Sequence, residues 1–217
     1  DELGEYAIKI YKSLEFNLTT AQIKSLRDIR SDLKLKKPMN RLIQGDVGCG
    51  KTIIAVITAA IVAGHHSQIA IMAPTEILAE QHYNSFEKHF KNYDISCQLL
   101  ISNISQKEKN DIYKNLKSGR INIIVGTHAL IQKKVIFKDL GLVIIDEQHR
   151  FGVDQRKSLL EKGDNPNVLS MTATPIPRTL AFTVHGDMDI SWIDEMPQNR
   201  KSIKTKLIYE KNVTNVY

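Results

Sequence analysis

An eight-residue segment combines glycines, a lysine and a threonine at the spacing GxxxxGK[ST]. It follows a strand-like apolar run and precedes the apolar run 53–63. In such a loop the glycines let backbone N–H groups turn inward around phosphate oxygens, and the next helix directs its positive end at the same anion. We therefore expect Lys51 to contact the β- and γ-phosphates of a nucleotide and Thr52 to offer its hydroxyl to magnesium. The segment consists of Gly45, Asp46, Val47, Gly48, Cys49, Gly50, Lys51 and Thr52.

Two adjacent acids, Asp146 and Glu147, end another apolar run at 142–145. A nucleotide-binding loop of this kind needs a second magnesium ligand and a group that orients the attacking water. Asp146 suits the first role, and Glu147 suits the second as a general base or orienting group. Without the loop, the pair would suit a solvated strand end equally well.

Six short apolar runs alternate with segments of helical period, and these runs are rich in Ile and Val. Strands that are apolar on both faces occur where helices cover a parallel sheet on both sides. The alternation predicts an α/β fold with a doubly wound, mostly parallel sheet and helices on both faces. The expected strands span 41–44, 68–73, 95–100, 121–125, 142–145 and 168–171.

Capping signals position two of the helices between these strands. Thr75 is a candidate N-cap for a helix over 76–90. Ser105 and Glu108 have the spacing of a capping box, and Gly119 is placed to end the helix that Ser105 begins. Beyond these elements, two shorter alternating stretches, 189–193 and 202–209, are separated by a turn.

Composition is that of an ordinary globular protein, with 42% hydrophobic and 25% charged residues among 217. Disordered, collagen-like and coiled-coil chains fit poorly. No apolar run approaches the roughly 18 residues that a membrane span requires, so no membrane association is expected. Cys49 and Cys97 show neither disulfide nor zinc-ligand spacing, which predicts a reducing, cytoplasmic location. The net charge of +6 favours a polyanionic partner without identifying one.

The tetrad Asp146, Glu147, Gln148 and His149 has the DExH form of superfamily 2 helicases and translocases. Other segments resemble further motifs of these enzymes. Residues 170–174 are similar to motif III, 73–76 to motif Ia, 126–128 to motif Ib and 16–22 to the Q motif.

One branch of the superfamily is especially similar. The strings PMNRLIQGDVGCGKT, MAPTEILAEQH, IDEQHRFGVDQR and MTATPIPRTLA resemble the RecG family of bacterial ATP-dependent DNA helicases, over about residues 16–200. Transcription-repair coupling factors share much of this pattern, but their acidic motif usually carries Asp-Glu-Glu-Gln. The resemblance implies a RecA-like P-loop NTPase domain, the first of two, in a helicase that remodels stalled replication forks and branched DNA in recombination and repair. It also implies ATP and magnesium as cofactors.

Roles follow from the resemblance residue by residue. Gln22 is implied to hydrogen-bond adenine, with Phe16 stacking on the ring. Lys51 and the acidic tetrad are implied to be catalytic, and Asp146 and Thr52 to hold magnesium. Gln148 and His149 would connect the γ-phosphate site to motif III. The residues implied in DNA binding or coupling are Pro74, Thr75, Thr127, His128, Phe151, Thr172 and Thr174.

Plainer structural roles compete with several of these assignments. The motif Ia and Ib residues also suit ordinary helix caps, the motif III threonines suit strand ends, and Phe151 suits a core position. His82 and His89 are expected to be surface or partly buried side chains and not metal ligands, since no third ligand is evident.

The resemblance further predicts the domain organisation. Residues 1–15 would be a linker or helix from a preceding domain, 16–196 the RecA-like ATP-binding domain, and 197–217 a strand or linker toward a second RecA-like domain. Both chain ends are expected to be cuts. The implied partners are branched or forked DNA and the second RecA-like and wedge domains of the same full-length chain, which would be monomeric. This fragment alone is expected to lack unwinding activity.

Two other classes of function remain open from the residues. A P-loop enzyme acting on a small molecule, such as a kinase, would carry the same glycine-rich loop. A binding module in which ATP regulates partner contact would carry it too. The DExH tetrad and the Thr-Ala-Thr motif favour the helicase, and the absence of an Asn-Lys-x-Asp signature disfavours a GTPase.

Overall fold

The computed structural model describes residues 4–174 and 188–197. Seven strands lie in the described part of the chain. They are β1 Asn40–Gly45, β2 Gln68–Met72, β3 Cys97–Leu100, β4 Ile123–Gly126, β5 Leu140–Asp146, β6 Asn167–Thr172 and β7 Asp189–Ile193.

Six α-helices and two short 3₁₀ helices connect or flank these strands. They are α1 Glu5–Lys12, α2 Thr20–Leu33, α3 Lys51–Ala63, α4 Glu76–Phe90, α5 Gln106–Ser118, η1 His128–Ile131, η2 Gln148–Arg150 and α6 Val153–Leu160.

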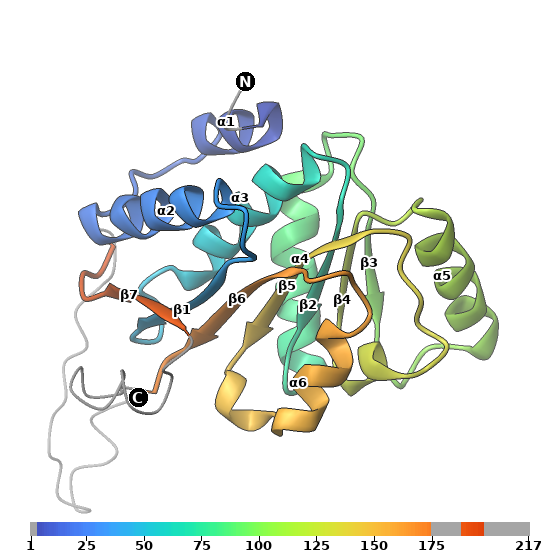
Figure 1. Cartoon of the computed structure of the whole chain (residues 1–217). Coiled ribbons are helices and arrows are strands. Elements are labelled where there is room, and N and C mark those ends of the chain that lie inside the picture. Colours follow the sequence, from blue (N-terminus) through green and yellow to red (C-terminus); the bar gives the residue numbers. More distant parts are fainter. Residues whose placement is uncertain (1–3, 175–187, 198–217) are drawn as a thin grey trace, which may run out of the picture.

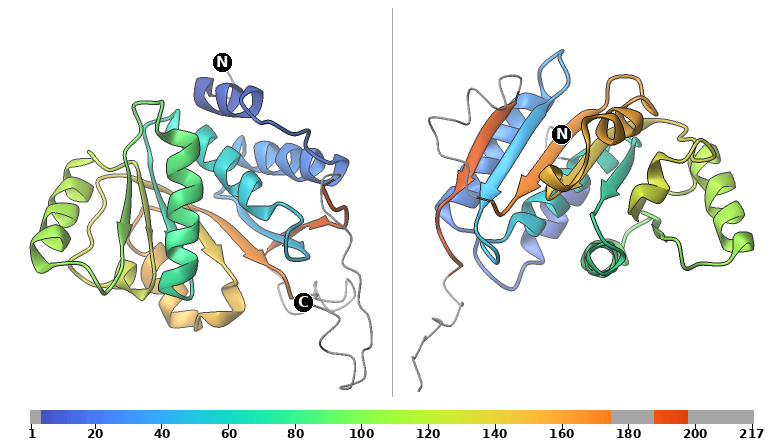
Figure 2. Two further views of the ribbon diagram at one scale, coloured as in Figure 1. Left: turned by 180° about the vertical axis from the view of Figure 1, so that it is seen from behind. Right: turned by 90° about the horizontal axis from the view of Figure 1, so that it is seen from below.

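The strands form one sheet in the order β3-β4-β2-β5-β6-β1-β7, and each of its pairings is parallel (Figure 1). Helices cover both faces (Figure 2). One face packs against α2, α3 and α4, and the other against α5, η1 and α6. The predicted doubly wound α/β fold is therefore confirmed.

Alternating side chains along the central strands point into the two separate cores. Ile69 and Ile71 of β2 contribute to the first core, while Ala70 and Met72 contribute to the second. This alternation explains why the strands are apolar throughout rather than on one face. Helix α3 lies within the first core, and each of its residues from Ile53 to Ala63 is buried.

The six strands predicted between 41 and 171 are all present, with ends shifted by one or two residues. The predicted stretch 189–193 is β7, which pairs with β1 at the edge of the sheet. The predicted stretch 202–209 lies outside the described residues, as does most of the predicted segment 197–217. Residues 1–15 contain α1, which packs on α3 (Figure 1).

The predicted caps of α4 and α5 are also present. Thr75 Oγ1 accepts a hydrogen bond from the Leu78 amide at 3.3 Å. Ser105 and Glu108 bond each other's backbone amides through their side chains, and Gly119 ends α5 at a positive φ of 78°.

The carboxyl ends of β1, β6 and β5 lie side by side, because the three strands are neighbours and parallel. In register, Asp146 of β5 is opposite Met171 of β6, and Met171 is opposite Ile43 of β1. Neighbouring strands are about 4.8 Å apart, so Asp146 lies roughly 10 Å across the sheet from β1. The segments that follow these three strands are far apart in the sequence, but they meet at the carboxyl-terminal end of the sheet.

In the part of the chain that the structure describes, no helix has the length and apolar character needed to cross a membrane.

Candidate nucleotide and nucleic-acid site

The glycine-rich loop joins β1 to α3 at the carboxyl-terminal end of the sheet. Gly48 and Gly50 adopt positive φ angles of 83° and 89°, which side chains other than glycine rarely tolerate. Gly50 is the N-cap of α3 and provides no side-chain cap. The first amides of the helix therefore have no acceptor from the capping residue and suit an anion. The Lys51 ammonium donates to the carbonyl oxygens of Gly45 and Asp46, at 2.6 and 3.0 Å.

Gln22 packs directly against this loop. Its Nε2 donates to the Cys49 carbonyl at 2.7 Å, and its Oε1 accepts from the Thr19 amide at 2.9 Å. The second bond belongs to a capping box that begins α2, in which Thr19 Oγ1 accepts from the Gln22 amide. A Cβ at Gly50 would come within 2.2 Å of Gln22 Nε2. Gln22 and the glycine therefore fix each other's positions.

A cavity of about 560 Å³ lies beside the loop. It brings together residues from the predicted Q motif and the loop, which lie far apart in the sequence. The sequence interpretation missed the contribution of α4, which supplies Ser85 and His89. Burial lowers the pKa of the His89 imidazole, with the Lys88 charge acting in the same direction. The predicted site residues that line this cavity are Phe16, Gln22, Gly50 and Thr52.

Cys49 fills the inside of the loop and is fully buried. Burial raises the pKa of its thiol, and this outweighs the opposing effect of Lys51. A helix N-terminus alone would lower a thiol pKa. The side chain is consistent with a packing role.

Asp146 is the last residue of β5. Its Oδ1 accepts the Glu147 amide at 3.0 Å, and its Oδ2 lies 2.7 Å from His82 Nε2 of α4. His82 is only 5% exposed, more deeply buried than its sequence position had indicated. The signal was present, because His82 occupies the buried stripe of α4 that also contains Ala79, Phe86 and Phe90.

Glu147 has a left-handed backbone with φ 48° and ψ 53°, which is uncommon for a residue other than glycine. This turn directs its carboxylate toward the end of β6. Glu147 Oε2 accepts from Thr172 Oγ1 at 3.2 Å, and the Ala173 amide donates to the same carboxylate at 3.3 Å. His149 Nδ1 lies 3.4 Å from Glu147 Oε2.

The acidic motif and motif III are linked through Glu147 as well as through His149 of the expected route. Thr172 reaches Glu147 directly, and its distance to His149 Nδ1 is 3.5 Å. Gln148 is buried, and its Oε1 accepts from Arg156 of α6 at 3.5 Å. Thr172 Oγ1 also accepts the Thr174 amide, which ties the rest of motif III to the same hydroxyl.

A second cavity, of about 520 Å³, opens next to this acidic motif. It brings residues predicted to contact DNA beside the predicted general base. The lining residues are Pro74, Thr75, Leu78, Glu147, His149, Arg150 and Thr174.

Four of the seven residues predicted in DNA binding or coupling do not line this cavity: Thr172, whose contacts are given above, and Thr127, His128 and Phe151. Thr127 is 2% exposed, and its hydroxyl has no hydrogen-bond partner among the described residues. His128 is exposed at the start of η1. Phe151 is half-buried against the second core, which favours the structural alternative for this side chain.

The residues present fit a magnesium ion that is shared with phosphates. Among residues 4–174 and 188–197, no cluster of three His, Cys, Asp or Glu side chains could hold a metal. Magnesium typically uses one or two protein oxygens together with substrate phosphates and water. Suitable ligands of this kind are Thr52, at the start of α3, and Asp146, at the carboxyl end of β5.

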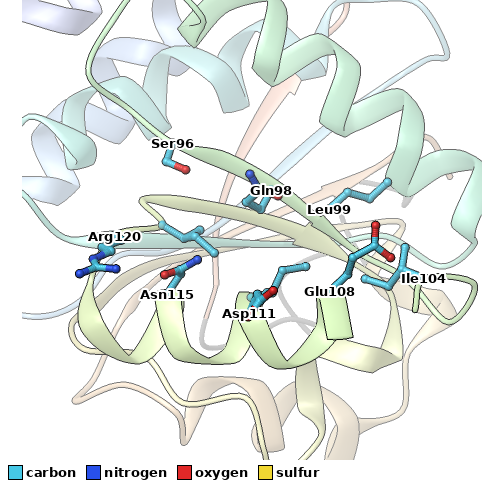
Figure 3. A pocket seen from close by; sticks show the side chains of 10 residues that line it. Ser96, Gln98, Leu99, Ile104, Glu108, Asp111, Asn115 and Arg120 are labelled. Atoms are coloured by element: carbon cyan, nitrogen blue, oxygen red, sulfur yellow. The ribbon is translucent and has the colours of Figure 1, made fainter. Parts of the chain in front are cut away.

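A hollow of about 500 Å³ lies at the far edge of the sheet, between β3 and α5 (Figure 3). Gln98, Asp111, Asn115 and Arg120 are among its lining residues. It contains none of the predicted site residues. The candidate chemistry therefore lies at the β1, β6 and β5 ends and not at this hollow.

Comparison with protein families agrees with this geometry. A model described as DEAD/DEAH box helicase matches residues 19–182. The chain belongs to this family. The predicted P-loop, acidic motif and motif III all fall within the matched region.

Curated relatives narrow the similarity to RecG helicases. The chain is 53% identical over 211 residues to the ATP-dependent DNA helicase RecG of Aquifex aeolicus, covering 96% of this chain and 27% of the relative. It is 56% identical over 204 residues to the Bacillus subtilis protein of the same name, covering 93% of this chain and 30% of the relative. The chain thus spans less than a third of the length of these relatives.

A solved structure of RecG bound to a three-way DNA junction is also similar, with a TM-score of 0.84 and 45% identity. The matched region covers 97% of this chain and 28% of the RecG chain. The RecA-like helicase fold and the predicted resemblance to RecG helicases are confirmed.

Proposed function

We propose that this chain is the ATP-binding motor domain of a RecG-like ATP-dependent DNA helicase that remodels stalled forks and branched DNA in recombination and repair. The observation that carries the proposal is the junction of three strand ends. The P-loop follows β1, the acid pair ends β5, and Thr172 between them holds Glu147. Nucleotide hydrolysis by a P-loop enzyme uses a phosphate-binding loop, a magnesium ligand and a group that orients water, and this arrangement offers a candidate for each.

ATP and magnesium are the proposed cofactors. Lys51 would exchange its two loop carbonyls for the β- and γ-phosphate oxygens, which neutralise its charge better. Thr52 and Asp146 would hold magnesium, which supplies charge stabilisation on the phosphates when bound. The uncapped first turn of α3 would donate backbone N–H groups to the same anion.

Glu147 is the proposed base, or orienting group, for the attacking water. Its carboxylate is held by the Thr172 hydroxyl and the Ala173 amide, so its direction is set by β6. His149 and Gln148 complete the catalytic motif, with Gln148 anchored toward Arg156. A fixed carboxylate positions water without paying for reorientation during the reaction.

Adenine recognition is proposed for Phe16 and Gln22 in the 560 Å³ cavity. Phe16 is 44% exposed, and its ring is available for stacking. The Gln22 amide has four hydrogen-bonding positions and uses two of them on Thr19 and Cys49. The remaining N–H donor and oxygen lone pair match the N7 acceptor and the N6 amino donor of adenine, whereas guanine has two acceptors at these positions, so ATP should bind more tightly than GTP.

Branched or forked DNA is the proposed partner, contacted beside the acidic motif. The cavity lined by Pro74, Thr75 and Thr174 supports this, together with the exposed His128. The RecG structure bound to a three-way junction supports the same class of substrate. Thr127 and Phe151 would contribute through their backbone or through packing, since Thr127 is buried.

The other domains that the helicase needs would lie in the rest of a full-length, monomeric, cytoplasmic protein. A second RecA-like domain would supply arginines to the transferred phosphoryl group, an effect worth about three to five powers of ten in rate. A wedge domain would separate the arms of the fork. The small share of each relative that this chain covers supports such additional domains.

The test compares this 217-residue chain with the full-length protein. We expect the chain to bind ADP with magnesium but to hydrolyse ATP slowly, with no stimulation by forked DNA. The full-length protein should hydrolyse ATP rapidly and separate forked strands. Strong fork-stimulated hydrolysis by the chain alone would contradict the proposal that hydrolysis needs the other domains.

A further inference from the structure

His82 lies on the buried stripe of α4, two turns after Thr75, and its ring faces the end of β5. Its side chain is 7% exposed, and the Asp146 side chain that it contacts is 13% exposed. His82 Nε2 is 2.7 Å from Asp146 Oδ2. Because an ionised carboxylate can only accept, the Nε2 atom carries the proton of this bond.

The other ring nitrogen makes no compensating contact. His82 Nδ1 is buried and has no hydrogen-bond partner within the described part of the chain. A buried polar atom without a partner costs free energy, so a histidine at this position is a poor choice for packing alone. An apolar residue of similar volume would fill the same space between Ala79 and Phe86 without that cost. The bond to Asp146 is therefore the feature that distinguishes His82 from a core residue.

The Asp146 carboxylate is fixed at both oxygens. Oδ1 accepts the Glu147 amide, and Oδ2 accepts His82 Nε2. These bonds use two of roughly four acceptor positions on the carboxylate. The remaining positions are free to face magnesium, or a water bound to it, in a direction that the two bonds determine.

We propose that His82 is a positioning residue that orients the Asp146 carboxylate toward the metal bound with the nucleotide. The inference rests on the proposed nucleotide site and adds a residue from α4 to it. Partners that orient a metal ligand commonly contribute about 10- to 100-fold to metal affinity. His82 itself contacts neither nucleotide nor metal.

Three substitutions in the full-length protein separate this role from packing. His82→Gln places an amide N–H near the position of Nε2, whereas His82→Asn places one near Nδ1, too far from Asp146. His82→Leu keeps the volume and removes both nitrogens. Asn84→Leu, on the exposed side of α4, is the matched control.

The measurement is the free magnesium concentration that gives half-maximal binding of a fluorescent, non-hydrolysable ATP analogue. We expect it to rise about 10-fold or more in the Leu and Asn variants and to return to within a few-fold of the parent in the Gln variant. Binding of fluorescent ADP in EDTA should be the same in all of them. Thermal unfolding verifies that each variant is folded.

Parental magnesium dependence in the Leu variant would overturn the inference, as would an equal defect in the Gln and Asn variants. An equal loss of ADP binding in EDTA would show a packing role and overturn it too. If the Leu variant fails to fold, the Gln and Asn pair decides. Failure of the proposed function is distinguishable, because the parent would then show no magnesium-dependent nucleotide binding at all.

Discussion

The Thr172 hydroxyl donates a hydrogen bond of 3.2 Å to the Glu147 carboxylate, joining the end of β6 to the residue that follows β5. Glu147 reaches this position through a left-handed backbone conformation. The contact connects motif III to the proposed base without an intermediate side chain. Any movement of the β6 end would therefore change the direction of that carboxylate.

Replacing Thr172 with valine tests this contact, since valine keeps the shape and removes the hydroxyl. A hydrogen bond to a charged group is worth about 1.5–3 kcal/mol, and about 1.4 kcal/mol corresponds to a tenfold change in rate. We expect kcat for ATP hydrolysis by the full-length protein to fall about tenfold or more, with nucleotide affinity unchanged. Thr172→Ser should recover most of the rate. Parental turnover in the valine variant would exclude the contact from catalysis.

Glu147→Gln keeps the size of the side chain but removes its charge and basicity. General base catalysis contributes about 10²–10⁴-fold, so steady-state hydrolysis should fall by at least the lower figure. The variant should still bind ATP with magnesium, because the P-loop and Asp146 are intact. Filter binding and phosphate release measure the two properties separately. Normal phosphate release would remove Glu147 from its assigned role.

Gln68, the first residue of the central strand β2, makes four side-chain hydrogen bonds, of which two are buried and two are partly buried. Its Nε2 donates to the carbonyls of Leu116 and Ile121, and its Oε1 accepts the amides of Lys138 and Asp139. Gln68→Leu removes these four hydrogen bonds. The Leu116 carbonyl keeps the Gly119 amide as a donor, and each of the other groups that stays buried without a partner costs about 1–3 kcal/mol.

Urea unfolding measures the effect of Gln68→Leu. We expect the free energy of unfolding to fall by about 3 kcal/mol or more. Gln98→Leu, on an exposed position of the edge strand β3, should change it by about 0.5 kcal/mol or less. Similar values for the two variants would show that water replaces the lost bonds.

Both cysteines should resist alkylation in the folded protein. Burial raises the pKa of the Cys97 thiol to about 12, and burial also raises the pKa of the Cys49 thiol. The thiolate is the reactive form, and for Cys97 it is about one part in 10⁴ at pH 8. Mass spectrometry after iodoacetamide treatment should detect modification only in urea, with Lys37→Cys as an exposed positive control. Rapid labelling of native Cys49 would contradict the packing described for the loop.

The sequence was sufficient to predict the strands, because each is a short, mainly apolar run, and the central strands β2 and β4 are buried on both faces. It was also sufficient for the caps of α4 and α5, since Thr75, Ser105, Glu108 and Gly119 act within one turn of chain. Both kinds of signal are local. The order of the strands was not predictable in this way, and the position of β7 beside β1 depends on pairing across almost 150 residues.

The site shows the same division. The spacing of the P-loop and the adjacency of Asp146 and Glu147 identified the two parts of the nucleotide site. Parallel strands bring these parts to the same end of the sheet. The Thr19 and Gln22 capping box was missed because the same residues were interpreted only as a nucleotide motif. His82 was missed because its importance lies in a contact with a residue 64 positions away, which no local pattern reveals.

The most direct test of the account is ATP hydrolysis by the full-length protein with forked DNA, linear duplex and RNA, compared at one salt concentration. Backbone contacts are sensitive to salt, so the ionic strength must be held constant. We predict that forked DNA stimulates hydrolysis most and that Lys51→Ala abolishes the activity with every substrate. Preferential stimulation by RNA, or full activity of the Lys51→Ala variant, would contradict it.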